Sequence, residues 1–139
     1  MPLIREKLMA GHSVRFSPRG SSMLPMLRHG IDSVILSPIP EQLKKYDLPL
    51  YRRDNGQYVL HRIVKTGQTY SCVGDNEYMI ENGLRKDQMI ALVTIFCRGR
   101  KEIAVTNTIY QFYCRIWHFS RPLRHILVRG FRWLRRHIQ

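Results

Sequence analysis

Acidic residues are scarce in this 139-residue chain. Asp and Glu total 10 against 23 Lys and Arg, which gives a formal net charge of +13 at neutral pH. Such an excess favours anionic partners, namely phospholipid surfaces, nucleic acids or acidic polypeptides. The shortage is complete over residues 109–139, which hold seven arginines and no acidic side chain. Apolar residues still make up 44% of the chain, which argues against a disordered protein.

Cysteines and long apolar runs are also few. Cys72, Cys97 and Cys114 form no CxxC pair and have no zinc-ligand spacing with histidine. They are predicted to be reduced, small apolar side chains, and no metal or cofactor is expected. The longest nearly apolar run, 89–97, is too short to span a membrane, and the N-terminus lacks the apolar core of a secretory signal. The sequence therefore predicts a cytoplasmic or peripheral membrane protein.

Short runs rich in Val, Ile, Leu and Tyr alternate with turn residues through the middle of the chain. The runs are SVILS, QYVLHRIV, TYSCV and MIALVTIFC, at 33–37, 57–64, 69–73 and 89–97. This pattern is typical of a mainly β domain with tight connections. Asn55-Gly56 is a strong hairpin signal, and TGQT predicts a second hairpin. We expect one compact β domain over residues 13–104, preceded by a short helix or arm at 1–12.

The last segment, residues 105–139, has a different pattern. Apolar residues recur at helical spacing on both sides of Pro122, with arginines between them. The apolar positions are Ile109, Phe112, Tyr113, Ile116 and Trp117 before the proline, and Leu123, Ile126, Leu127, Phe131, Leu134 and Ile138 after it. The pattern predicts an amphipathic helical extension made of two helices that Pro122 separates.

Two uses of this basic tail compete. It can pack its apolar side on the β domain and leave its arginines in water. Alternatively, it lies in a membrane interface, where arginines meet anionic headgroups and aromatic rings sink below them. The absence of acids and the aromatic content favour the membrane, and nucleic acid ranks third because no nucleic-acid-binding signature is present. The residues expected to contact lipid are Arg121, Arg124, Arg129, Arg132, Arg135, Arg136, Trp117 and Trp133.

One serine in RGSSMLPML, residues 19–27, stands in a setting that suits chemistry. Pro25 restricts Leu24 to extended geometry, and Gly20 can adopt a positive φ, so a stiff turn can hold Ser22. A nucleophilic serine also needs a base within hydrogen-bond reach and donors for an oxyanion. The same residues are ordinary loop punctuation, so the segment alone leaves both interpretations open.

His61 is the best candidate for the base, and Asp75 for an acid that orients it. If QYVLHRIV forms one strand, Val59, His61 and Ile63 share a face, and apolar neighbours favour the neutral imidazole. A lone strand histidine is more often a satisfied core residue, and Gly-Asp-Asn, which contains Asp75, is a common turn sequence. Residue types and spacing therefore leave the site undecided.

Taken together, the motifs resemble the serine peptidase superfamily of signal peptidases and self-cleaving phage-type repressors. GSSMLPML is similar to the family's first box. YVLHRIV and VGDNE resemble the second and third boxes of the histidine-using branch, the endoplasmic-reticulum and sporulation-type signal peptidases. The boxes occur in the family order within residues 14–101. The resemblance implies a compact, coiled β domain and a hydrolase that cleaves an extended peptide or protein substrate.

The resemblance also implies a role for each matching residue. Ser22 would be the nucleophile, His61 the general base, and Asp75 would orient the histidine or support the site. Arg62 would be structural, and main-chain N–H groups near the nucleophile would bind the oxyanion. The expected substrate and oxyanion residues are Gly20, Ser21 and Met23.

The chain departs from the family pattern at several points. Gly20 stands where many members have a second donor serine, and Tyr46 stands where relatives commonly have glycine. Neither a membrane anchor nor a DNA-binding domain precedes the first box, so the basic tail is expected to replace the anchor. These departures keep open a catalytically inactive membrane-interface module on the same scaffold. Self-cleavage within 9–13 is the third alternative.

Overall fold

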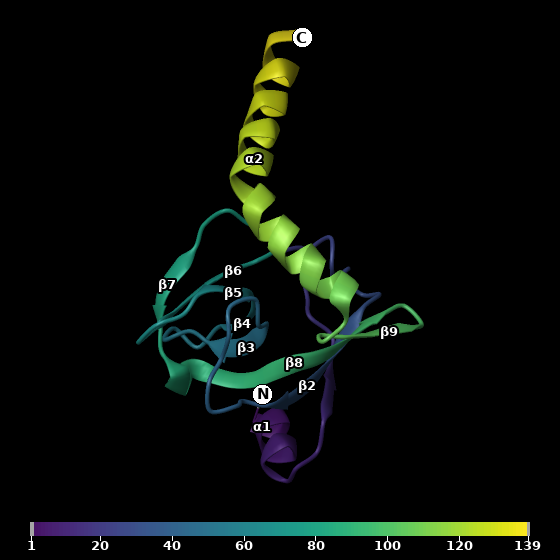
Figure 1. Cartoon of the computed structure of the whole chain (residues 1–139), viewed down its shortest axis with the longest axis vertical. Helices are drawn as coiled ribbons and strands as arrows, with labels where there is room; N and C mark the ends of the chain where they lie inside the picture. Colours follow the sequence, from purple (N-terminus) through teal and green to yellow (C-terminus); the bar gives the residue numbers. More distant parts are fainter. Residues whose placement is uncertain (1, 139) are drawn as a thin grey trace.

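A computed structural model describes residues 2–138 as two antiparallel sheets and a long C-terminal helix (Figure 1). The larger sheet has the order β1-β2-β8-β3-β4, with β9 also paired to β8, and the smaller has the order β5-β6-β7. The larger sheet comprises β1 (Val14–Phe16), β2 (Ser33–Pro38), β3 (Pro49–Arg52), β4 (Tyr58–Leu60), β8 (Met89–Arg98) and β9 (Lys101–Ala104). The smaller comprises β5 (Arg62–Lys65), β6 (Tyr70–Val73) and β7 (Glu81–Leu84). The chain therefore has a mainly β fold with a C-terminal helix, as predicted.

Several local predictions are confirmed. The runs at 33–37, 69–73 and 89–97 form β2, β6 and β8, and α1 (Pro2–Met9) is the short N-terminal helix. Both predicted hairpins form, since β3 pairs with β4 around Asn55-Gly56 and β5 pairs with β6. Gly56 has φ +90°, a value that favours glycine. A short 3₁₀ helix, η1 (Lys86–Gln88), leads into β8.

The prediction of one strand through QYVLHRIV is wrong. β4 ends at Leu60 in the larger sheet and β5 begins at Arg62 in the smaller sheet, so His61 lies between the two. All residues from Val59 to Val64 are buried, whereas a strand with one solvated face alternates buried and exposed positions. The continuous burial arises because the chain passes from one sheet into the other within the core.

The serine segment is anchored by its own apolar residues. Met23, Met26 and Leu27 are buried in the core cluster that also holds Leu36 and Phe96 of the larger sheet. Burying a side chain of this size contributes about 1.5–3 kcal/mol, so the turn that carries Ser22 is fixed to the core. The three cysteines are buried and free, as predicted.

The C-terminal segment forms one helix, α2 (Thr108–Ile138), and not the two predicted helices. Pro122 lies inside it, and the helix changes direction about halfway along its length (Figure 1). A proline removes one backbone donor and crowds the preceding turn, which kinks a helix without necessarily ending it. The first half packs on the β domain through residues that include Tyr110, Cys114 and Arg121, and the second half projects away. Within residues 2–138, no helix combines the length and apolarity needed to cross a bilayer.

Candidate functional site

Ser22 and His61 line the same cavity, which has a volume of about 830 Å³. Ser22 is half-buried in the turn that follows β1, and His61 is buried at the junction of β4 and β5. Gly20, Ser21 and Met23 also line this cavity. The structure therefore brings together the predicted nucleophile, the predicted base and the predicted substrate segment, which come from two distant stretches of sequence.

Gly74 lies between the serine segment and the histidine. A Cβ atom built on Gly74 would be 2.5 Å from the Ser22 carbonyl oxygen, 3.2 Å from His61 Cδ2 and 3.0 Å from a Glu77 carboxylate oxygen. The backbone also ties these segments together, because the Asn76 N–H donates to the Ser22 carbonyl at 2.9 Å. A side chain at position 74 has no room, which gives a physical reason for the glycine in VGDNE.

Gly74→Ala should therefore push Ser22 and His61 apart. The added methyl group meets backbone on one side, so we expect a loss of about 1–3 kcal/mol in the free energy of unfolding, measured by urea denaturation. Gly67→Ala is the matched control, because its Cβ would meet only ordinary contact at 3.7 Å. Equal stabilities of the two variants would contradict the close approach at Gly74.

The partner of the His61 imidazole is Glu77. His61 is 6% exposed, and its Nε2 is 3.1 Å from Glu77 Oε1. Its Nδ1 is 3.5 Å from Tyr51 Oη, which donates to Glu81 at 2.7 Å. Burial lowers the pKa of His61 and the Glu77 charge opposes that effect, so the imidazole is neutral at pH 7. The 3.1 Å contact therefore joins a neutral imidazole to a carboxylate.

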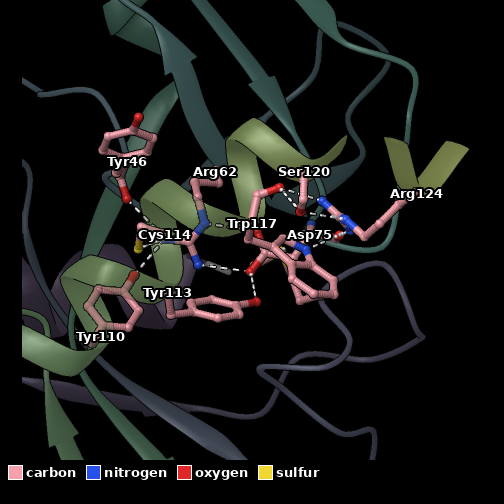
Figure 2. A network of polar contacts seen from close by, with 10 residues as sticks. Tyr46, Arg62, Asp75, Tyr110, Tyr113, Cys114, Trp117, Ser120 and Arg124 are labelled. Atoms are coloured by element: carbon pink, nitrogen blue, oxygen red, sulfur yellow. Dashed lines mark hydrogen bonds and ion pairs between the residues drawn. The ribbon is translucent and has the colours of Figure 1, made fainter. Parts of the chain in front are cut away.

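Asp75 has other partners. Its fully buried carboxylate accepts hydrogen bonds from Arg62 Nε and Nη2 at 2.8 and 2.9 Å, and from Tyr113 Oη at 2.7 Å (Figure 2). Among residues 2–138, no hydrogen bond or ion pair joins Asp75 to His61. Asp75 therefore makes no contact through which it could orient His61, and Glu77, for which no role was predicted, contacts the histidine instead.

Arg62 links the second and third motifs to α2. Besides Asp75, its guanidinium donates to the Tyr46 carbonyl at 3.0 Å, to Tyr110 Oη at 2.6 Å and to Cys114 Sγ at 3.1 Å (Figure 2). Tyr46 has φ +77°, in the left-handed region that favours glycine. The expected structural role of Arg62 thus extends to docking of the C-terminal helix.

Three residues expected to contact lipid instead pack on the β domain. The Trp117 indole N–H donates to the Asp75 carbonyl at 2.6 Å, and the Arg124 guanidinium lies 3.6 Å from the Trp117 ring centre. Arg121 is buried. The expected lipid contacts that remain exposed are Arg129, Arg132, Arg135, Arg136 and Trp133.

Main-chain donors near Ser22 remain available for an oxyanion. Gly20 has φ +86°, and its N–H donates to His29 Nδ1 at 2.8 Å, so this donor is in use. The Met23 side chain is buried and accepts the Asp75 N–H at its sulfur, at 3.4 Å. Within the described chain, the N–H groups of Ser21, Ser22 and Met23 have no protein acceptor. These three groups are the candidates for stabilising a negative oxygen above Ser22.

Comparisons with protein-family models, with curated proteins and with solved structures returned no match for this chain. The family resemblance therefore rests on the three sequence motifs alone.

Proposed function

We propose that this protein is a serine endopeptidase of the signal-peptidase type, with Ser22 as nucleophile and His61 as general base. The observation that supports this most strongly is the shared cavity, which both Ser22 and His61 line, with Gly74 close to the Ser22 carbonyl and to the His61 ring. The specific fold proposed is the coiled β domain of that superfamily. A cavity of about 830 Å³ accommodates several residues of an extended peptide.

The chemistry follows from the groups around His61. His61 takes the Ser22 proton as Oγ attacks a peptide carbonyl, and the tetrahedral oxyanion accepts hydrogen bonds from nearby main-chain N–H groups. For this step the neutral imidazole carries its proton on Nδ1, which faces Tyr51 Oη. The unprotonated Nε2 leaves its contact with Glu77 and accepts the proton from Ser22 Oγ. Glu77 then stabilises the imidazolium, which protonates the leaving amine. Water hydrolyses the acyl-enzyme by the same route.

Covalent labelling tests the nucleophile directly. A fluorophosphonate probe should modify the unsubstituted protein once, and peptide mapping by mass spectrometry should locate the adduct at Ser22. Ser21→Ala should still be labelled, whereas Ser22→Ala should not. An adduct at any other residue, or no adduct together with no cleavage of a diverse peptide library, would refute the proposal.

The pH dependence of cleavage tests the role of Glu77. The Glu77 carboxylate raises the pKa of His61 against the larger effect of burial. Glu77→Gln should therefore lower that pKa further and move the acidic limb of the kcat/KM profile to lower pH. Asp87→Asn, at an exposed and distant site, should leave the limb in place. A limb that moves to higher pH, or does not move, would exclude Glu77 as the charge beside the base.

A second candidate function, attachment to an anionic membrane, is favoured by the exposed face of α2. The docked residues Tyr110, Cys114 and Arg121 lie on one side of the helix, and an apolar stripe faces solvent on another side. The exposed stripe consists of Ile109, Phe112, Ile116, Phe119, Leu123, Ile126, Leu127, Phe131, Leu134 and Ile138. The exposed apolar stripe therefore stays in contact with solvent when α2 docks on the β domain.

Vesicle flotation tests this attachment. The double substitution Leu127→Glu and Leu134→Glu should lower binding to phosphatidylglycerol vesicles by more than about tenfold, because each buried leucine contributes about 1.5–3 kcal/mol. Gln68→Glu with Thr69→Glu adds the same charge at exposed positions of the β5–β6 turn and is the control. Equal flotation of both double variants would refute the attachment.

A further inference from the structure

A second cavity, of about 820 Å³, lies between residues 78–80 and the middle of α2. One wall is Tyr78, Met79 and Ile80, in the segment between β6 and β7. The helix wall is His118, Phe119, Arg121, Pro122 and His125. Asn76 and Glu77 line this cavity and also line the cavity that holds Ser22 and His61. The two cavities therefore share a boundary.

Unpaired nitrogen atoms concentrate in this second cavity. Within residues 2–138, four buried side-chain polar atoms lack a hydrogen-bond partner, and three of them belong to residues lining it. The three are His118 Nδ1, Arg121 Nε and His125 Nδ1. Arg121 is only 7% exposed. Buried polar groups are almost always paired, so these atoms indicate a site that is completed by a ligand.

The charge around the cavity specifies what that ligand is. Two acids lie near the cavity: Asp75 is already bound by Arg62 and Tyr113, and Glu77, which lines the cavity, is in contact with His61. Arg121 therefore has no carboxylate of its own in the described part of the chain. An acceptor-only group with negative charge satisfies both the guanidinium and neighbouring imidazole N–H groups. The apolar walls, Met79 and Ile80 among them, suit the carbon chain that carries it.

We propose that the second cavity binds an acidic residue of the peptide whose bond is cut at Ser22, with its carboxylate on Arg121. The inference rests on the proposed peptidase function and adds a substrate class to it, namely peptides with a glutamate or aspartate among apolar residues. The shared Asn76 and Glu77 boundary provides the continuity that one extended chain needs to occupy both cavities.

A lipid headgroup fits this cavity less well than a peptide does. Residues two apart on a helix are about 200° apart around its axis, so they point to nearly opposite sides. Arg121 and His125 each lie two positions from Leu123, which belongs to the exposed apolar stripe. Phe119 belongs both to the stripe and to the cavity lining, but a membrane on the stripe would still lie on the side of α2 opposite to Arg121 and His125.

Side-chain NMR of isotopically labelled Ser22→Ala protein tests the inference without cleavage. The probes are acetyl-Ala-Leu-Ala-Leu-Glu-Leu-amide and the same peptide with glutamine in place of glutamate. The glutamate peptide should shift the Arg121 Nε–H and the His118 and His125 ring signals, and should bind about tenfold more tightly. Arg121→Gln should abolish that preference, and Arg129→Gln, on the exposed outer half of α2, should retain it.

The outcomes separate this inference from the peptidase proposal. Equal binding of the two peptides by protein with Arg121 intact would refute the acidic subsite, whatever the stability of the Arg121→Gln variant. Shifts of the Arg121 signal with phosphatidylglycerol vesicles but not with the glutamate peptide would make the cavity a headgroup site and would also refute it. Glutamate preference, together with no fluorophosphonate adduct on the unsubstituted protein and no cleavage of the peptide library, would support the acidic subsite and refute the peptidase proposal.

Discussion

Ser22→Ala should lower peptide cleavage by at least about 10³-fold in kcat, the scale of loss when a peptidase loses its nucleophile. Ser21→Ala should stay within about threefold of the unsubstituted protein, which is the order expected for a substitution outside the reacting groups. The neighbouring serine is a demanding control, because both serines line the same cavity. Initial rates on one peptide chosen from a cleaved library, followed by mass spectrometry, give the ratio.

Main-chain hydrogen bonds to Asn76 hold both serines in place, whichever side chains they carry. The Ser21 carbonyl accepts the Asn76 side-chain amide at 3.1 Å, and the Ser22 carbonyl accepts the Asn76 N–H at 2.9 Å. Alanine keeps both carbonyls, so either variant should retain the fold, and unchanged urea unfolding curves are the control. Retained cleavage by Ser22→Ala, or an equal loss for Ser21→Ala, would remove Ser22 as the nucleophile.

The β elements were predictable because their signals are local. The runs that form β2, β6 and β8 are apolar, β-branched and bounded by turn residues, and Asn55-Gly56 specifies its hairpin from two residues. The change of sheet at His61 was not predictable, because a continuous buried run fits a strand inside one sheet equally well. Only tertiary packing determines that the chain changes sheet at His61.

The composition of the site was predictable in part, and its contacts were not. The motif similarity pointed to Ser22 and His61, which line one cavity. It also pointed to Asp75, but His61 and Arg62 are adjacent, and spacing does not say which of the two faces the carboxylate. Glu77 stands two residues beyond Asp75 in the same motif, and only the fold brings it to the imidazole.

The C-terminal helix was likewise predictable in part. Helical periodicity and the excess of arginine could be predicted from the sequence. The docked face, however, is formed by Tyr110, Tyr113 and Trp117 and not by the exposed apolar stripe. The reason is chemical, because Arg62 and Asp75 present buried polar groups that phenol and indole groups can satisfy. Aliphatic side chains have no such donor or acceptor.

Arg62→Met should lower the free energy of unfolding by about 3–5 kcal/mol, the cost of leaving one partner of a buried ion pair uncompensated. Asp75 is fully buried, and its ion-pair partner is Arg62, so the substitution leaves a carboxylate in the core with only the Tyr113 hydroxyl. Arg85→Met removes an arginine whose ion pairs, with Asp54 and Asp87, lie at the surface. That control should cost less than about 1 kcal/mol. Urea denaturation measures both.

A second substitution separates the charge from the packing. In Arg62→Met with Asp75→Leu no unpaired charge remains, and replacing a buried pair by apolar residues often restores stability. The double variant should therefore be more stable than Arg62→Met alone. It still lacks the bonds from Arg62 to Tyr110 and Cys114, so α2 should dock less firmly and Trp117 fluorescence should shift to longer wavelength. A double variant no more stable than Arg62→Met would mean that the guanidinium stabilises the fold mainly by holding the helix, and not by neutralising Asp75.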